Sequence, residues 1–206
     1  MTTNPEFWED FYADGKGRWS GRANALLVDA ATDLTPGVAL DLGSGQGGDA
    51  VWLATMGWQV VAVDISTAAL TFAAEHATTA GVSAAISWER HDLDVTFPDG
   101  EYDLVTTSYL HSPVELGREA ILRRALPAVR PGGHLIVIGH AGPPSWDPGH
   151  HHGVELPSAA EVVAALDLPA DWAVERCAEV DVAMQDPDGN PATRLDSVVH
   201  VRRPAA

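Results

Sequence analysis

The feature of this sequence that most limits the possible fold of the chain is a glycine-rich stretch between an expected strand and an expected helix. The strand, residues 38–42, ends at Gly43, and Gly43, Gly45 and Gly48 have the spacing G-x-G-x-x-G. Glycines at this spacing allow a sharp turn and let a ligand approach the backbone closely. Asp64 ends the next expected strand, 64 − 43 = 21 positions after Gly43, where a carboxylate can accept hydrogen bonds from a ribose diol. The stretch therefore predicts a site for a ligand that contains adenosine.

Expected strands and helices alternate over much of the chain. Short apolar runs typical of buried strands occupy residues 38–42, 58–64, 84–90, 102–109 and 134–139. Segments with helical spacing or composition occupy residues 48–56, 66–80, 114–129 and 157–167. Two further strand-like runs, residues 172–184 and 193–203, flank a loop rich in Pro and Gly, which is typical of an antiparallel hairpin. This order predicts an α/β fold with a doubly wound, mostly parallel sheet and a closing antiparallel hairpin.

The composition excludes several classes of partner. Twelve Lys and Arg against 29 Asp and Glu give a formal net charge of −17, and this field repels nucleic acid and anionic membrane surfaces. No apolar run approaches the roughly 20 residues that span a bilayer, and the first residues lack the pattern of a secretory signal. Cys177 is the single cysteine, so no intrachain disulfide is possible. We expect a cytoplasmic protein that acts on a small molecule.

Asp41 indicates which adenosine ligand fits the glycine-rich stretch. In a dinucleotide site the pyrophosphate lies at the amino end of the following helix, and an acid two residues before Gly43 would repel it. S-adenosylmethionine (SAM) carries a sulfonium and an ammonium, which the same acid attracts. Three alternatives stay open: Asp41 braces the turn through backbone hydrogen bonds, the site holds NAD in an oxidoreductase, or the chain binds a nucleoside without catalysis.

The order of four segments resembles the class I SAM-dependent methyltransferases over nearly the whole chain. The segments are VALDLGSGQGGD, VVAVDIS, HDLDVTFPDGEYDLV and LPAVRPGGHLIVIG. Two more stretches, FWEDFYADGKGRWSGRAN and AVWLATMGWQVVAVD, look most like the small tellurite-resistance-type branch, with thiopurine methyltransferases more remote. The resemblance implies a Rossmann-like fold with a seven-stranded sheet whose final hairpin is antiparallel. Ser44 stands where many family members have cysteine, which is a conservative change.

The resemblance also implies which residues hold SAM. Its methionine part would lie against the glycine loop and a covering aromatic residue, its ribose against Asp64, and its adenine against residues after the second and third strands. The implied cofactor-binding residues are Trp19, Asp41, Gly43, Gly45, Gly47, Asp64, Ile65, Asp92, Leu93 and Thr107. Taken alone, Asp92 suits a helix cap or a turn equally well.

Histidines after two strands are the candidate catalytic bases. Methyl transfer from a sulfonium is an in-line displacement, which needs a base only when the acceptor has a high pKa. His111 follows the fourth strand and His140 the fifth, so we expect both at the edge of the sheet where ligands bind, with a structural or solvated role as the alternative. The residues expected to contact the acceptor are Tyr12, Tyr109, Trp146 and Arg194. The methylated atom, whether O, N, S or a metalloid, stays open.

No metal is expected in the histidine-bearing loop that follows residue 140. Asp147, His150, His152 and His140 offer suitable ligand types, but their spacing matches no known zinc signature. We expect a single domain over residues 1–206. Its expected parts are a helical flap at 1–32, a SAM-binding core at 38–140, and an acceptor-side loop, helix and hairpin at 141–206.

Overall fold

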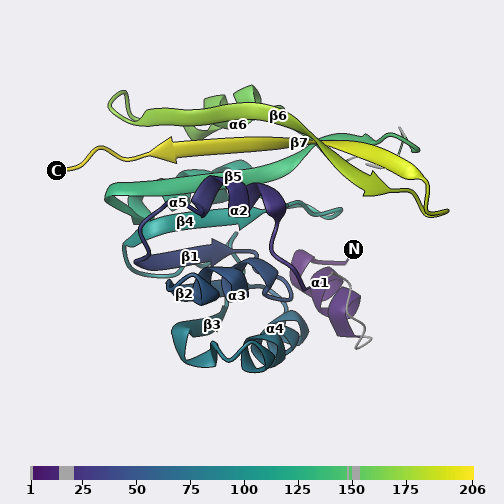
Figure 1. Ribbon diagram of the computed structural model, residues 1–206, viewed down its shortest axis with the longest axis horizontal. Helices are drawn as coiled ribbons and strands as arrows, with labels where there is room; N and C mark the ends of the chain where they lie inside the picture. The colour runs from purple at the N-terminus through teal and green to yellow at the C-terminus, as the bar shows by residue number, and fades with distance from the viewer. Residues whose placement is uncertain (1, 14–20, 148, 150–153) are drawn as a thin grey trace.

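A computed structural model describes residues 2–13, 21–147, 149 and 154–206. Seven strands form one sheet in the order β3-β2-β1-β4-β5-β7-β6 (Figure 1). The strands are β1 (Val38–Leu42), β2 (Gln59–Asp64), β3 (Ile86–Arg90), β4 (Tyr102–Ser108), β5 (Val129–Pro144), β6 (Ala173–Gln185) and β7 (Pro191–Arg202). The first five strands pair in parallel, and β7 is antiparallel to both β5 and β6. The predicted α/β fold with its closing antiparallel hairpin is confirmed.

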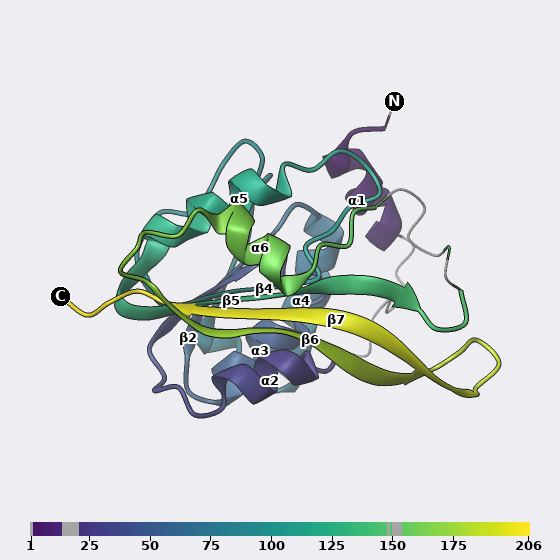
Figure 2. The ribbon, with the colours of Figure 1, turned by 90° about the horizontal axis from the view of Figure 1, so that it is seen from above.

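Helices cover both faces of the sheet. They are α1 (Asn4–Ala13), α2 (Ala25–Ala31), α3 (Gly48–Thr55), α4 (Thr67–Thr79), α5 (Arg118–Ala125) and α6 (Ala159–Leu166). Buried side chains of α2, α3 and α4 form one apolar cluster with one face of the sheet, and those of α5 and α6 form a second cluster with the other face. Figure 2 shows α2 and α3 on one side of the strands and α5 and α6 on the other. Within the described residues, no helix combines the length and apolar composition that a membrane span requires.

The strand order creates one crevice at the carboxyl ends of the parallel strands. From β1 the chain builds outwards to β2 and β3, and then returns to place β4 on the other side of β1. Ligands of open α/β sheets bind where the strand order reverses in this way. The crevice at the ends of β1 and β4 is therefore where the site is built.

Short-range signals account for the elements that border this crevice. Strand β1 covers residues 38–42 as expected, because a β-branched and apolar run ends at a glycine turn. Ser66 caps α4 as expected, and its hydroxyl accepts a hydrogen bond from the N–H of Ala69 at 3.1 Å.

Three expected elements differ in the structure. The helix expected over residues 114–129 is confined to α5 and is followed by a 3₁₀ turn that contains Pro127, because proline has no N–H to continue the helix. The strand expected over residues 134–139 is longer: β5 begins at Val129 and includes Gly132, which has a φ of +81° and lies where the pairing with β4 shifts register. The expected front helix is divided into α1 and α2, and residues 14–20 lie outside the described residues.

Candidate functional site

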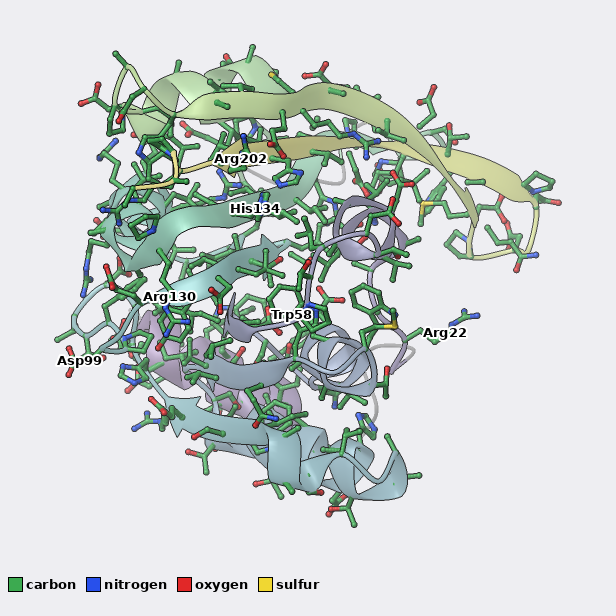
Figure 3. All side chains as sticks on the ribbon, turned by 60° about the vertical axis from the view of Figure 1, so that its left-hand side comes forward. Arg22, Trp58, Asp99, Arg130, His134 and Arg202 are labelled. Atoms are coloured by element: carbon green, nitrogen blue, oxygen red, sulfur yellow. The ribbon has the colours of Figure 1, made fainter. Side chains whose placement is uncertain are left out.

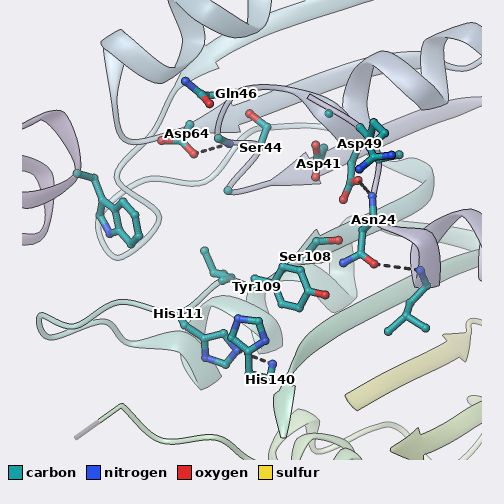
Figure 4. Close-up of a pocket in the computed structure, with 18 of the residues that line it drawn as sticks. Asn24, Asp41, Ser44, Gln46, Asp49, Asp64, Ser108, Tyr109, His111 and His140 are labelled. Atoms are coloured by element: carbon teal, nitrogen blue, oxygen red, sulfur yellow. Dashed lines mark hydrogen bonds between the residues drawn. The ribbon is translucent and has the colours of Figure 1, made fainter. Parts of the chain in front are cut away.

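A pocket of about 730 Å³ opens at the carboxyl ends of β1, β2, β4 and β5. Its wall also includes side chains from α1, the start of α3, β6 and β7. The residues predicted from the sequence that line it are Tyr12, Asp41, Gly43, Gly45, Asp64, Ile65, Leu93, Tyr109, His111, His140 and Arg194. Figure 4 shows the acidic residues Asp41 and Asp49 near the glycine loop, and the rings of Tyr109, His111 and His140 on another side of the pocket.

The glycine loop after β1 presents backbone to the pocket. Gly43 and Gly45 have φ values of +73° and +52°, a region that favours glycine. The N–H of Gly43 donates to the carbonyl of Val63 at 2.9 Å, which ties the loop to β2. A Cβ added to Gly43 would lie 2.9 Å from Cδ1 of Leu110, another residue of the pocket wall. Glycine at this position therefore keeps the pocket open.

Gly47, which was predicted to bind the cofactor, has a packing role in the structure. It is the N-cap of α3 with a φ of +82°, and it does not line the pocket. A Cβ at this position would lie 2.8 Å from Cβ of Ala73 and 2.8 Å from Cη2 of Trp88. The bare backbone of Gly47 thus allows α3 to start close to α4 and β3.

Three carboxylates gather in the pocket wall around the loop: Asp41 at the end of β1, Asp49 in the first turn of α3, and Asp64 at the end of β2. Asp41 is 2% exposed, and its buried Oδ2 has no hydrogen-bond partner among the described residues. Burial, followed by the charges of Asp49 and Asp64, raises the pKa of Asp41 well above its ordinary value. Burial is also the largest cause that raises the pKa of Asp49 and of Asp64.

No cation of the described chain is ion-paired with these three carboxylates. A buried charge without a partner is costly, and the raised pKa values express this cost. The wall around the glycine loop is therefore suited to a ligand that brings positive charge.

Sequence reasoning missed Asp49, although it follows the glycines directly. An acid in the first turn of a helix is common, because it interacts favourably with the helix dipole, and its position alone does not distinguish a cap from a ligand-binding group. In the structure Asp49 accepts a hydrogen bond of 2.6 Å from the N–H of Asn24, the N-cap of α2. This bond joins the beginnings of α2 and α3 at the pocket.

Asp64 is held by the backbone at the end of β2. Its Oδ2 accepts a hydrogen bond from the N–H of Gly45 at 2.8 Å, and its Oδ1 accepts one from the N–H of Ser66 at 2.9 Å. A carboxylate offers about four acceptor positions, so these two bonds orient the group and leave capacity for a diol. The geometry is compatible with the ribose role that the sequence suggested.

The wall beyond Asp64 is formed by Ile65, His91 and Leu93. Asp92 was expected to hold the adenine edge, but it does not line the pocket. Its Oδ1 accepts a hydrogen bond from the N–H of Asp94 at 3.2 Å, so the carboxylate closes a turn. The turn alternative is therefore the one that the structure supports for Asp92.

Asp196 of β7 organises the other end of the pocket. Its side chain is buried and accepts hydrogen bonds from the hydroxyl of Tyr109 at 2.7 Å, from Nε of Arg194 at 2.8 Å and from Nη2 of Arg194 at 2.9 Å. It also pairs with Nδ1 of His140 at 3.0 Å. Burial would raise the pKa of Asp196, but the bonds from His140, Arg194 and Tyr109 lower this pKa to about 2. Asp196 is therefore an ionised carboxylate with internal partners.

Arg194 and Tyr109 complete this network. The guanidinium of Arg194 bonds to both oxygens of Asp196 and lies 5.1 Å from the centre of the Tyr109 ring, so its charge is already paired within the protein. Tyr109 has a φ of +56°, an uncommon conformation outside glycine that often occurs at functional sites. Its ring stacks on His140 with centroids 4.2 Å apart. The network holds the His140 ring in place.

The two candidate bases differ in the state of their nitrogens. Nε2 of His111 accepts a hydrogen bond from the backbone N–H of His140 at 3.1 Å, so Nδ1 of His111 carries the proton. Burial and the charge of Arg118 lower the pKa of His111 to about 3. Its acceptor nitrogen is thus occupied and weakly basic, which argues against His111 as a general base.

His140 has the opposite arrangement. Asp196 can only accept a hydrogen bond, so Nδ1 of His140 donates to it and Nε2 of His140 carries a lone pair. A carboxylate, an imidazole Nδ1–H and a lone pair at Nε2 form the orienting half of a catalytic triad. His140 is the histidine whose geometry fits a base.

Comparison with known proteins gives a match to one family model over part of the chain. Residues 39–133 match the family model of the methyltransferase domain. The match covers 95 of the 206 residues, which is less than half of the chain. Among curated proteins none matches the chain.

Solved structures share the fold of this chain. A structure from work on the conversion of a disulfide bond into a thioacetal group during echinomycin biosynthesis is 24% identical, with 99% of this chain and 93% of that chain covered and a TM-score of 0.73. TehB from Haemophilus influenzae is 19% identical, with 95% and 67% covered and a TM-score of 0.69. The N-methyltransferase NodS from Bradyrhizobium japonicum WM9, solved with S-adenosyl-L-homocysteine, is 17% identical, with 87% and 84% covered and a TM-score of 0.66.

The remaining residues predicted for the site fall into three groups. Thr107 and Trp146 do not line the pocket: the hydroxyl of Thr107 donates to the carbonyl of Leu42 at 2.9 Å inside the sheet, and Trp146 lies in the turn after β5. Tyr12 does line the pocket, together with Trp8 of the same helix. Trp19 lies outside the described residues.

Proposed function

We propose that the chain binds SAM as its methyl donor and transfers the methyl group to a small-molecule acceptor. The observation that carries this proposal is the group of buried carboxylates, Asp41, Asp49 and Asp64, without ion-pair partners among the described residues. The sulfonium and ammonium of SAM would supply positive charge to carboxylates that have no ion-pair partner among the described residues, and its ribose diol matches the acceptor capacity of Asp64. NodS, which shares the fold, is known with S-adenosyl-L-homocysteine bound.

The same carboxylates argue against NAD. A pyrophosphate at the start of α3 would lie beside Asp41 and Asp49, two acids in the wall of the same loop. Each would repel it, and their pKa values are already raised by burial. The glycine spacing alone, which suits either ligand, is therefore outweighed by charge.

We further propose His140 as the general base for the acceptor. When bound, SAM supplies an activated methyl group that a nucleophile takes by in-line displacement. Nε2 of His140 accepts the proton of the acceptor, while Asp196 keeps Nδ1–H oriented and stabilises the imidazolium that forms. His111 holds the backbone of His140 through the bond from its N–H, and so acts as a positioning residue.

The proposal of His140 as a base limits the chemical class of the acceptor. A thiolate or a tertiary amine needs no base, whereas a hydroxyl needs one. The pocket wall also contains the apolar side chains of Leu110 and Leu116 and the aromatic rings of Trp8 and Tyr12. We therefore propose a small acceptor with a hydroxyl group and an apolar body. The tellurite-resistance-type branch stays a proposal that rests on the sequence segments quoted above.

Two measurements test the proposal. Calorimetry with SAM, S-adenosylhomocysteine and NAD should show binding of the two sulfur nucleosides and none of NAD; tight binding of NAD alone would refute the cofactor. An assay for S-adenosylhomocysteine release over a panel of small acceptors should show turnover with hydroxyl compounds. Turnover confined to tertiary amines would refute His140 as a general base and leave the proposed role of the carboxylates in SAM binding intact.

A further inference from the structure

A second cluster of polar side chains lies on the last three strands, outside the pocket. His134 of β5, Glu175 of β6 and His200 of β7 each direct one ligand atom toward the other two, and these atoms all lie within 4.8 Å of one another. None of the three is found among the described residues that line the pocket. Figure 3 shows His134 and Arg202 on neighbouring strands, and the two are direct partners in the pairing of β5 with β7.

The distances between the three atoms match those of a shared metal ion. Nδ1 of His134 lies 2.9 Å from Nε2 of His200 and 3.7 Å from Oε2 of Glu175. Nε2 of His200 lies 3.4 Å from Oε2 of Glu175. Ligands about 2.1 Å from a tetrahedral ion are about 3.4 Å from each other. Each separation is within about half an ångström of this value, so small side-chain adjustments would complete the geometry.

The neighbours of Glu175 orient its free oxygen. Nε of Arg202 lies 3.0 Å from Oε1 of Glu175, so Oε2 is the oxygen that faces the two imidazoles. A partner that holds the second oxygen of a ligating carboxylate is typical of metal sites. The other nearby cation, Arg176, is paired with Asp29 of α2 at 2.7 Å. Each of the two arginines is therefore paired with a carboxylate, Arg202 with Glu175 and Arg176 with Asp29.

We propose that His134, Glu175 and His200 bind a divalent transition-metal ion of the zinc class. Two imidazoles and one carboxylate are ligands that zinc accepts, and three protein ligands leave a fourth position for water. The ion would connect β5, β6 and β7, and thus fasten the closing hairpin to the parallel part of the sheet. This site lies apart from the pocket and does not depend on the proposed methyl transfer.

Titration with Co²⁺ tests the site, because a tetrahedral Co²⁺ complex absorbs in the visible range. The full chain should bind one tight equivalent, which Zn²⁺ displaces with loss of the absorption band. Glu175→Gln and His134→Asn should each lower the affinity by at least about 10–100-fold, the loss that partners outside the ligand set already cause. Zn²⁺ should raise the Tm of the parent protein and leave that of both variants unchanged.

A matched control separates this site from the histidine tract. The triple variant His150→Asn, His151→Asn, His152→Asn should keep the tight equivalent and its absorption band. Circular dichroism checks that Glu175→Gln and His134→Asn are folded, which is expected because both side chains are partly exposed. Unchanged Co²⁺ affinity in both single variants, or loss of the tight equivalent in the triple variant, would overturn the proposal.

Discussion

Two buried aspartates at opposite ends of the pocket have opposite electrostatic surroundings. Asp41 stands beside Asp49 and Asp64, and burial raises its pKa well above the ordinary value. Asp196 is buried too, yet bonds from His140, Arg194 and Tyr109 lower its pKa to about 2. Among the described residues, no cation is ion-paired with Asp41 or its acidic neighbours, whereas the charge of Asp196 is already balanced by partners within the protein.

Under the proposed function, this difference separates two tasks, the binding of a cation and the transfer of a proton. Groups that must bind a cation are held by the backbone without a cationic partner, as Asp64 is by Gly45 and Ser66. Groups that must move a proton are oriented before the reaction, as His140 is by Asp196 and the stacked ring of Tyr109. The following predictions test whether the two ends are as distinct as this.

The largest effect is expected for His140→Asn. Turnover should fall by about 10²–10⁴-fold, the usual contribution of a general base, while the affinity for SAM stays unchanged. Single-turnover kinetics and calorimetry measure the two quantities. His111→Asn is the matched control, and we expect a smaller loss of rate from it because His111 only positions the backbone of His140. Equal losses in the two variants would make the base assignment wrong.

Asp196→Asn should destabilise the fold. The substitution leaves Arg194 without its buried carboxylate partner, and breaking such a pair costs about 3–5 kcal/mol. Urea unfolding measures the loss. Asp41→Asn should not lose stability in the same assay, because it removes a carboxylate that burial and like charges disfavour. A similar loss in both variants would show that the two aspartates are not in contrasting environments.

Asp41→Asn should weaken SAM binding by about 1.5–3 kcal/mol, the usual value of a hydrogen bond to a charged group, or about 10–100-fold in Kd. Asp64→Ala should weaken SAM binding by a similar amount through loss of the ribose contact. Calorimetry with SAM and with uncharged adenosine distinguishes the two variants. Asp41→Asn should leave the affinity for adenosine unchanged, whereas Asp64→Ala should lower it. An unchanged Kd for SAM in Asp41→Asn would remove the electrostatic argument for the cofactor.

The smallest effect concerns pH. The pKa values of Asp41, Asp49 and Asp64 are raised in the folded protein, so the free protein loses stability as pH rises from the ordinary carboxylate pKa through these raised values. A bound cation favours the ionised carboxylates, so SAM binding should release up to about one proton and tighten as pH rises in this window. Calorimetry in buffers of different ionisation enthalpy measures the release. Proton uptake would contradict the prediction.

The parallel sheet and the glycine loop were predictable because their signals are short. A run such as residues 38–42 needs only its own side chains to favour a strand, and Ser66 caps α4 through a bond to a residue three positions away. The helix expected over residues 114–129 was too long, because periodicity continued past Pro127, which has no N–H to donate. Local patterns thus indicate where elements form more reliably than where they end.

The glycine-loop side of the pocket is built from neighbours along the chain, since Asp41 lies near the end of β1 and Gly43 and Gly45 lie in the turn that follows. The acceptor end is not: Asp196 meets Tyr109 and His140 only through the antiparallel register of β5 with β7. The same register brings His134 to His200. Hydrogen-bond partners, and with them the proton positions on His111 and His140, depend on strands far apart in the sequence, and only folding brings those strands together.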